Sequence, residues 1–459
     1  MLSINDLHQY QKDAVNAVCS MDKLALFLDL GLGKTIISLT AVKWLIDKAK
    51  IKNVLIIAPK TVAETVWPVE ISLWSHTKGL RVSSIMGNPK QRTTALNDST
   101  AEVFIISRDN VAWLFTQDVP QIDMLIIDES TSFKGNTQRY AALMQKTVHI
   151  GGKIYRRKNT LISMFKRVLL LTATPNSEGY NDGIYRQVSL LFPHNNPLGK
   201  TITQFRETYM LPSYFGGPYP QYVKVKPGAI EAINKVLQPF CISMKKEKYL
   251  ELPERIDIVR HIKSNNSSSN NKYYEYMEKN SVVHIDNTDI IAGDVLTKYN
   301  KLQQLSAGFI YDEQGGLHVI NHEKEQVLQE MLESVQENVL IMYKYQYEKE
   351  LLINMGGVPL DTPEAITQWK QGKIRIGLLY PASGGYGLNL ASGGAVVIWF
   401  TLPLSLEQYV QSNGRIHRQG QTKTVRVYHL LATTIDNHIY QLLQAKKEVL
   451  QGLLNAFEH

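Results

Sequence analysis

Short, uninterrupted apolar runs recur along the first third of the chain. They lie at residues 24–28, 54–58, 103–107, 124–127 and 168–171. Each run is too short for a helix and lacks alternation with polar residues, which is typical of parallel strands covered on both faces. After Thr35, apolar residues recur at the spacing of one helix face as far as Leu45. Strands that alternate with helices predict a parallel α/β sheet.

A second series of apolar runs begins late in the chain, again with helical patterns between its members. The runs are residues 339–342, 374–379, 395–400 and 425–430. We therefore expect two α/β lobes, an N-terminal one over residues 1–243 and a C-terminal one over residues 244–459. Less regular stretches, about 180–243 and 265–336, are expected to be helical and hairpin insertions. Gly-Gly pairs predict hairpin turns at Gly151 and within residues 309–320.

The composition is that of a globular protein and agrees with two or three domains. The chain has 459 residues, of which 44% are hydrophobic. No apolar run approaches the length of a membrane helix, and the start lacks the layout of a signal peptide, so we expect a cytoplasmic protein without a membrane partner. Lys and Arg exceed Asp and Glu by 8, which favours a polyanionic partner such as nucleic acid.

A glycine-rich turn follows the first apolar run and precedes the first helical pattern. In this context the glycines Gly31 and Gly33 let the backbone wrap a phosphate, and the start of the helix presents free N–H groups to it. Lys34 is expected to meet the β and γ phosphates of ATP, and the Thr35 hydroxyl to help hold Mg²⁺. The first glycine of the general motif is replaced by Leu28. The whole segment reads Asp29, Leu30, Gly31, Leu32, Gly33, Lys34 and Thr35.

Two acids end the apolar run at residues 124–127. The carboxyl end of a strand is where an open α/β sheet places its ligand. Asp128 suits a Mg²⁺ ligand, and Glu129 suits the base that orients the attacking water. Beside a phosphate loop in the same α/β unit, this pair predicts nucleotide hydrolysis.

These segments resemble the motifs of superfamily-two helicases, and in particular the Swi/Snf-type branch. Asp128 to Thr131 and Leu171 to Pro175 resemble motifs II and III, and residues 7–11 resemble the adenine-reading motif with Gln11 at the reading position. Gly384 to Leu390 resembles motif V, and Gln411 to Gln421 resembles motif VI. The resemblance covers about residues 2–450 and implies two tandem RecA-like lobes. The chain is short for a member of this branch. In its length it resembles bacterial and bacteriophage members.

The resemblance also implies a composite ATP site that both lobes complete. Arg415 and Arg418 of motif VI are three residues apart, so on a helix they would project from one face and stabilise charge on the transferred phosphoryl group. Further nucleotide contacts are expected from Gly387 in motif V and from Gln411. Gln421 is expected to be a polar support.

A nucleic-acid track across both lobes is implied as well, mostly through phosphates. The first lobe offers residues after its second and third strands and the basic end of the Gly151 hairpin, and the second lobe offers residues after motif IV and at motif V. These candidates are Lys60, Thr61, Ser107, Arg108, Arg156, Arg157, Lys158, Lys344, Ser383 and Gly384.

The sequence thus predicts an ATP hydrolase that translocates on double-stranded or branched DNA. Remodelling of forks, junctions or DNA-bound proteins, in replication, recombination or repair, would be the consequence, and replication or recombination proteins are candidate partners. Two alternatives stay open: a strand-separating DNA or RNA helicase, and an ATP-gated clamp or loading factor. The Asp-Glu-Ser-Thr form of motif II does not settle the substrate.

Overall fold

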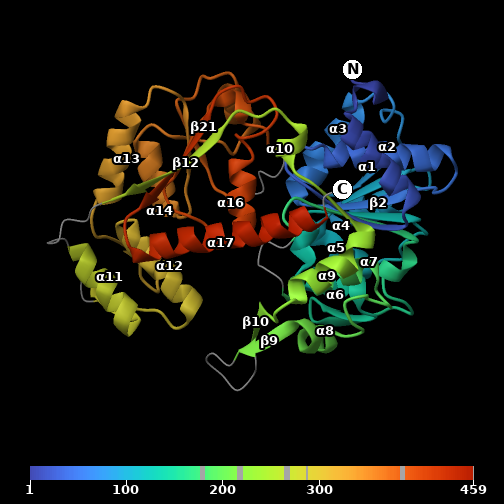
Figure 1. Ribbon diagram of the computed structural model, residues 1–459, viewed down its shortest axis with the longest axis horizontal. Helices are drawn as coiled ribbons and strands as arrows, with labels where there is room; N and C mark the ends of the chain where they lie inside the picture. Colours follow the sequence, from blue (N-terminus) through green and yellow to red (C-terminus); the bar gives the residue numbers. More distant parts are fainter. Residues whose placement is uncertain (176–180, 214–220, 263–268, 286–287, 383–387, 458–459) are drawn as a thin grey trace. The chain divides into compact units, whose positions relative to one another are not determined.

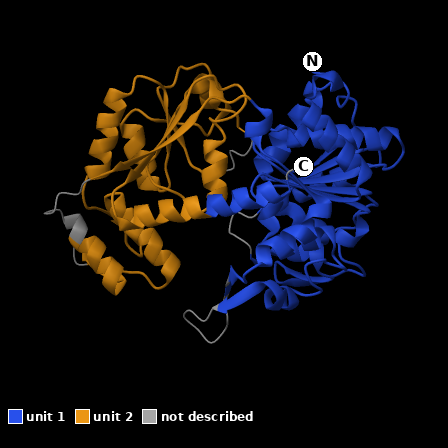
Figure 2. Ribbon diagram, in the orientation of Figure 1, with its two compact units in different colours: residues 1–250, 446–459 blue, residues 251–445 orange. Residues whose placement is uncertain are grey.

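The computed structural model describes residues 1–175, 181–213, 221–262, 269–285, 288–382 and 388–457. It divides into two compact units, residues 1–250 with 446–459 and residues 251–445 (Figure 2). The predicted fold class, two tandem α/β lobes with parallel sheets and small insertions, is confirmed. Within the described residues, none of the helices has the length and apolar character needed to cross a membrane.

The first unit is built on a parallel sheet in the order β11-β1-β8-β5-β2-β4-β3. Its central strands β2, β4 and β5 are buried throughout, as their unbroken apolar sequence predicts. The strands are β1 (Lys23–Leu28), β2 (Val54–Ala58), β3 (Val82–Ile85), β4 (Val103–Ser107), β5 (Met124–Asp128), β8 (Arg167–Thr172) and β11 (Cys241–Met244).

Helices cover both faces of this sheet. Figure 1 shows α1, α2 and α3 on one side and α5, α6 and α7 on the other. The helices are α1 (Gln9–Ser20), α2 (Lys34–Asp47), α3 (Trp67–Leu73), α4 (Pro89–Leu96), α5 (Val111–Phe115), α6 (Gln138–Met144), α7 (Asp182–Leu191), α8 (Ile202–Tyr209), α9 (Ala229–Leu237) and α10 (Lys246–Tyr249). Two antiparallel hairpins, β6 (Thr147–Ile150) with β7 (Lys153–Arg156) and β9 (Met210–Ser213) with β10 (Gln221–Val225), extend from the unit.

The second unit has its own parallel sheet in the order β12-β21-β20-β17-β19-β18. Its strands are β12 (Arg255–His261), β17 (Val339–Met342), β18 (Val358–Pro359), β19 (Ile376–Leu379), β20 (Val396–Trp399) and β21 (Val425–Leu431). Its helices are α11 (Ser269–Asn280), α12 (Val295–Ser306), α13 (Glu323–Ser334), α14 (Gln346–Asn354), α15 (Pro363–Lys370), α16 (Leu406–Asn413) and α17 (Thr434–Ala456). Two hairpins, β13 (Val282–Ile285) with β14 (Thr288–Ile291) and β15 (Phe309–Tyr311) with β16 (Leu317–Val319), complete it.

The division into units differs from the predicted one at the end of the chain. The first unit extends to residue 250 and includes residues 446–459. The reason lies at the edge strand β11, where the Ser243 N–H donates to the Phe457 carbonyl over 3.0 Å and the Ser243 hydroxyl donates to the Leu454 carbonyl. The Phe457 ring also lies 6.2 Å from that of Phe27 on β1.

Helix α13 is part of the second unit's core, whereas the sequence placed it in an insertion. Its residue Leu328 is fully buried in the hydrophobic cluster that includes Val339 and Ile341 of β17. The predicted Gly-Gly hairpins are present, with Gly151 and Gly152 at φ of 56° and 76°. Both values lie in the left-handed region that a tight hairpin turn requires and that glycine adopts readily.

Candidate ATP site and nucleic-acid edge

The phosphate loop has the strand-loop-helix context that the sequence predicted. Strand β1 ends at Leu28, and α2 begins at Lys34. The two loop glycines, Gly31 and Gly33, have φ of 91° and 82°, values that side chains rarely tolerate. The loop therefore turns sharply into the start of α2, the end of a helix that favours an anion.

Gln11 lies directly against this loop. Its amide accepts the His8 N–H over 2.9 Å and donates to the Leu32 carbonyl over 3.3 Å. A Cβ placed on Gly33 would meet the Gln11 amide nitrogen at 2.4 Å, so a larger residue could not occupy that position without displacing Gln11. The amide retains one N–H and one lone pair. That is the donor and acceptor pair that recognises the edge of an adenine.

The other loop residues are held by contacts within the loop and with α10. The Lys34 ammonium donates to the Leu28 carbonyl over 2.8 Å and to the Asp29 carbonyl over 3.4 Å. Leu32 is fully buried, and Thr35 lies in the first turn of α2. The Asp29 carboxylate accepts the Lys246 N–H over 3.2 Å, which ties the loop to α10.

Asp128 is a buried carboxylate held by two donors. It receives the Trp67 indole N–H over 3.0 Å on one oxygen and the Glu129 N–H over 3.0 Å on the other. Burial raises the pKa of Asp128, while the nearby charges of Lys34 and Arg108 act to lower it. The lysine of the phosphate loop and the acid of motif II therefore lie within electrostatic reach of each other.

Glu129 has a backbone conformation that is uncommon for a residue with a side chain. Its φ of 50° and ψ of 56° lie in the left-handed region, which is uncommon for a residue with a side chain and concentrates at functional sites. Its carboxylate accepts the Thr172 hydroxyl over 3.4 Å, and that hydroxyl in turn receives the Thr174 N–H over 3.1 Å. Motif III thus supports the acid of motif II.

Two contacts of this arrangement were not predicted from the sequence, although Thr172 belongs to motif III. Thr172 ends β8, which lies next to β5, so its contact with Glu129 follows from a strand order that sequence alone does not give. Trp67 is fully buried on α3 and looks like an ordinary core residue in the sequence. Only its indole N–H, directed at Asp128, reveals the role.

The side chains present suit Mg²⁺. The ion prefers hard oxygen ligands and is commonly bound through one or two protein groups together with substrate phosphates. Asp128 accepts one N–H on each carboxylate oxygen and retains further lone pairs, and Thr35 supplies a hydroxyl from the phosphate loop.

The strand order of the first sheet separates the predicted ATP residues from the predicted nucleic-acid residues. The phosphate loop, Thr172 and the acid pair follow β1, β8 and β5, which are neighbours. Lys60 with Thr61 and Ser107 with Arg108 follow β2 and β4, the next strands in the sheet. All of these strands are parallel, so the two groups lie side by side along one carboxyl edge.

The four predicted nucleic-acid residues at this edge differ in accessibility. Lys60 is exposed, and Thr61 and Arg108 are half-buried. Ser107 is only 2% exposed, and its hydroxyl accepts the Asp109 N–H over 3.3 Å as the cap of the following turn. The structure therefore does not support a phosphate contact through the Ser107 side chain.

The basic residues at the end of the β6–β7 hairpin also differ in accessibility. Arg156 and Lys158 are exposed. The Arg157 guanidinium donates to the Phe115 carbonyl over 3.0 Å and to the Gln117 carbonyl over 2.7 Å. Arg157 therefore anchors the hairpin to the end of α5, and its predicted contact with a phosphate is not supported.

In the second unit, the arginine pair of motif VI does not lie on a helix, which corrects the prediction. Helix α16 ends at Asn413, and Gly414 follows as its cap. Arg415 and Arg418 lie in the turns after it, so the spacing of three does not place them on a helix face. Arg415 is 4% exposed, and its carbonyl accepts the Leu390 N–H over 3.0 Å. Arg418 donates to the Leu388 carbonyl over 3.2 Å, and burial lowers its pKa.

The polar residues around the arginines are supports within the second unit. Gln421 donates to the carbonyls of Ala391 and Gly394 over 3.0 Å and 2.9 Å, which holds motif VI against the segment before β20. Gln411, which the sequence placed at the nucleotide, is buried on α16 and donates to Glu407 over 3.5 Å. No nucleotide role is visible in that contact.

Lys344 faces the interior of the second unit. Its ammonium donates to Asn300 over 2.8 Å and to Gln303 over 2.6 Å, both on α12, and burial lowers its pKa to about 8. A direct phosphate contact by this lysine is therefore not supported. The predicted residues Ser383, Gly384 and Gly387 lie outside the described residues.

Comparison with known proteins identifies the family. The model of the SNF2-related domain matches residues 10–307. A putative protein of Acyrthosiphon pisum secondary endosymbiont phage 1 is 28% identical, with 98% of each chain aligned. The ATP-dependent helicase brm of Drosophila melanogaster is 24% identical over 93% of this chain, which spans only 28% of that relative's length.

A solved structure titled the Sulfolobus solfataricus SWI2/SNF2 ATPase core in complex with dsDNA is similar over 98% of this chain and 92% of its own. The TM-score is 0.45 and the identity 18%. The chromatin structure-remodeling complex subunit snf21 of Schizosaccharomyces pombe is 22% identical over 92% of this chain, which spans 36% of that protein. From the family match we conclude that the chain is an ATP-hydrolysing member of the SNF2-related family, as its sequence motifs predicted.

Proposed function

We propose that this chain is a DNA-dependent ATPase that translocates on double-stranded DNA. The observation that carries the proposal is the strand order of the first unit, which brings the phosphate loop, Thr172 and the acid pair alongside candidates for DNA contact at one edge. The residues proposed for hydrolysis follow β1, β8 and β5. The candidate DNA contacts after β2 follow the strand next to β5. A motor needs this proximity, because a change at the nucleotide must reach the track.

Within the ATP site, each residue has a distinct task. Gln11 reads the adenine, and Lys34 with the loop N–H groups holds the β and γ phosphates. Glu129 orients the attacking water, and its strained backbone together with Thr172 fixes its carboxylate. Asp128 and Thr35 would hold Mg²⁺, which when bound neutralises charge on the phosphate oxygens.

The second unit supplies the arginine pair. Arg415 and Arg418 are guanidinium groups whose charge would stabilise the transferred phosphoryl oxygens when the units close on ATP. Both are held by backbone contacts to motif V, so movement of that motif and of the arginines is coupled. This coupling supports a cycle in which hydrolysis alternates with a change in the grip on DNA.

The track is formed by exposed and half-buried groups of the first unit. Lys60, Thr61, Arg156 and Lys158 would contact DNA phosphates without reading sequence. Arg108 could also act on the ATP site, because its positive charge acts to lower the pKa of the Asp128 carboxyl. A phosphate that attracts Arg108 would therefore change the electrostatics of the metal ligand, which gives DNA a direct way to stimulate hydrolysis.

The biological role we propose is the remodelling of forks, junctions or DNA-bound proteins in replication, recombination or repair. The similarity to a putative phage protein, aligned over 98% of each chain, supports a role in a phage-infected bacterium. Such a protein would act in the cytoplasm of a bacterial host, with replication or recombination proteins as partners.

The test is an ATPase assay with duplex DNA, forks, four-way junctions, single-stranded DNA and RNA, combined with displacement of a triplex-forming third strand. We expect duplex and branched DNA to stimulate hydrolysis more than single strands do. We also expect ATP-dependent displacement of the third strand without separation of the duplex.

The outcomes separate the proposal from its rivals. Strand separation in the same assays would favour a helicase, and stimulation by RNA alone would exclude a DNA track. Full biological effect in a Glu129→Gln variant that binds but does not hydrolyse ATP would favour an ATP-gated clamp. Equal ATPase rates with and without any nucleic acid would reject the proposal.

A further inference from the structure

A cavity of about 270 Å³ lies at the carboxyl edge of the second unit's sheet. It opens where the neighbouring strands β20, β17 and β19 end, the position at which parallel sheets place ligands. Helix α12 and the start of α16 complete its wall. The lining residues are Asn300, Tyr343, Lys344, Tyr380, Pro381, Ala382, Thr401, Pro403, Leu404, Ser405 and Gln408.

One wall of the cavity is a pair of stacked tyrosines. Tyr343 follows β17 directly and Tyr380 follows β19, and their ring centroids lie 5.8 Å apart with planes inclined by 28°. Tyr343 is 8% exposed and belongs to the hydrophobic core, whereas Tyr380 is 38% exposed. The core thus supports Tyr343, and the ring stacked on it is partly exposed.

The cavity also presents polar groups that suit the edge of a flat heterocycle. The Lys344 ammonium donates to Asn300 and Gln303 and has a third N–H. Asn300, Ser405 and Gln408 add amide and hydroxyl groups. The described lining residues offer amide, hydroxyl and ammonium groups and no carboxylate.

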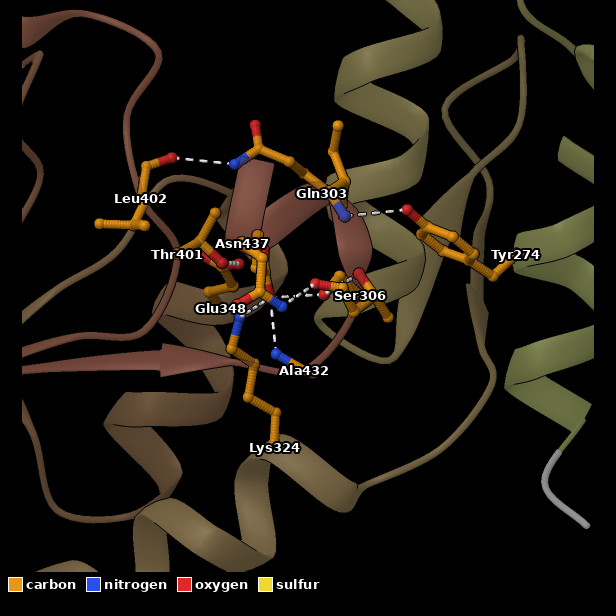
Figure 3. A network of polar contacts seen from close by, with 12 residues as sticks. Tyr274, Gln303, Ser306, Lys324, Glu348, Thr401, Leu402, Ala432 and Asn437 are labelled. Carbon is orange, nitrogen blue, oxygen red and sulfur yellow. Dashed lines mark hydrogen bonds and ion pairs between the residues drawn. The ribbon is translucent and has the colours of Figure 1, made fainter. Parts of the chain in front are cut away.

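The floor of the cavity is rigid. Thr401 donates to the fully buried Glu348 over 2.6 Å, and Glu348 also accepts the Lys344 N–H over 2.7 Å. Gln303 donates to the Leu402 carbonyl over 2.9 Å. Figure 3 shows the Thr401–Glu348 and Gln303–Leu402 contacts with Lys324 nearby. The buried Lys324 ammonium lies 3.2 Å from the Asp436 carboxylate. A pocket so supported is pre-formed and loses little entropy when it is filled.

We propose that this cavity receives one unpaired nucleobase of the DNA, stacked on Tyr380. The volume holds a single base, the tyrosine supplies a stacking surface, and the polar groups meet the base edge. The inference rests on the proposed function and sharpens its substrate class. Because an unpaired base enters without the cost of unstacking a base pair, the chain favours forks, gaps and junctions over uninterrupted duplex.

The experiment compares binding to two duplexes that differ only by a single bulged thymine, without ATP. Fluorescence anisotropy gives the affinity ratio, and permanganate oxidation reports whether the bulged thymine is covered. We expect the wild-type chain to prefer the bulged duplex about tenfold, at the low end of what one stacked base contributes, and to protect the thymine.

Three variants define the result. Tyr380→Ala should abolish both the preference and the protection, while Tyr380→Phe should retain both because the stacking ring remains. Tyr276→Ala, at a tyrosine of α11 that is 60% exposed, is the matched control and should behave as wild type. Equal affinity for the two duplexes, or preference retained in Tyr380→Ala, would overturn the inference.

The inference and the proposed function can fail separately. Duplex-stimulated ATP hydrolysis without any preference for the bulged duplex would reject the base site and leave the motor standing. A preference that depends on Tyr380, with no stimulation of hydrolysis by DNA, would support the base site and reject the motor.

Discussion

The two sheets hold their predicted functional residues in different ways. In the first unit, Asp128 ends a strand and Glu129 follows it, and the phosphate loop connects a strand to a helix. The backbone therefore fixes the positions of these residues. In the second unit, the arginines lie in turns beyond the end of α16, and Lys344 is directed into the interior by two amides of α12. The strands fix the residues of the first unit, whereas those of the second unit depend on the turns and side-chain contacts around them.

This difference teaches which motifs can be interpreted from sequence alone. A residue that ends a parallel strand has a fixed place along the carboxyl edge once the strand order is known. A long side chain on a turn can be directed to several partners within its reach. Substitutions in both units can show whether the second unit, despite this freedom, is as important to hydrolysis as the first.

The largest effect is expected from the arginine pair. Arg415→Lys and Arg418→Lys each keep a positive charge but lose the planar fork, so we expect kcat for ATP to fall by about 1000-fold with little change in KM. Steady-state ATPase assays with duplex DNA give both parameters.

The control for the arginine variants is Arg260→Lys, at an exposed arginine of β12 in the same unit. Thermal unfolding of all three variants separates catalysis from stability, because Arg415 is almost completely buried. Normal hydrolysis in both motif VI variants would mean that the second unit adds no charge to the ATP site.

The next effect is expected at the first unit's acid pair. Glu129→Gln retains the size and the hydrogen-bond acceptor for Thr172 but removes the base, so kcat should fall by about 100-fold while ATP binding is preserved. Binding is measured with a fluorescent ATP analogue. Glu64→Gln, at an exposed glutamate, should hydrolyse ATP normally. A Glu129→Gln variant that retains the wild-type rate would show that another group activates the water.

Much of the fold could be predicted because its strands are uniformly apolar. The predicted runs at residues 54–58, 103–107 and 339–342 coincide with β2, β4 and β17. The edge strands β3, β11 and β12 were not predicted. The first two have only four residues each, and β12 consists of exposed and half-buried positions, so it forms no apolar run. Helix α13 was assigned to an insertion because its sequence does not show which sheet Leu328 packs against.

The candidate site was predictable only where chemistry and backbone coincide. Lys34, Asp128 and Glu129 were recognised because their motifs name both the residue and its place on a strand or loop. Trp67 was not, because an indole N–H directed at a carboxylate looks like any core tryptophan in a sequence. Arg157 was placed on DNA by its charge, yet that charge is used by two carbonyls of the α5 end.

A smaller effect is expected at the β6–β7 hairpin, where it tests which basic residues bind DNA and which stabilise the fold. Replacing Arg156 and Lys158 together by alanine should weaken DNA binding and reduce the salt slope by about two, since each phosphate contact releases counterions. Arg157→Ala should instead lower the free energy of unfolding by about 2 kcal/mol through its lost hydrogen bonds. Salt titrations and urea unfolding measure the two quantities. A salt slope that changes only in Arg157→Ala would reverse the assignment.

The smallest effect concerns the buried ammonium of Lys344. Burial lowers the pKa of Lys344 from 10.5 to about 8, so between these values the unfolded chain binds more protons than the folded one. Folding stability from this group must therefore rise with pH over that window and be lowest below pH 8. We expect wild type to gain stability relative to Lys344→Met between pH 7.5 and 9.5 in urea unfolding. Lys370→Met, at an exposed lysine, is the matched control. Parallel profiles for wild type and Lys344→Met would mean that the ammonium is solvated, and the predicted phosphate contact of Lys344 would then stand again.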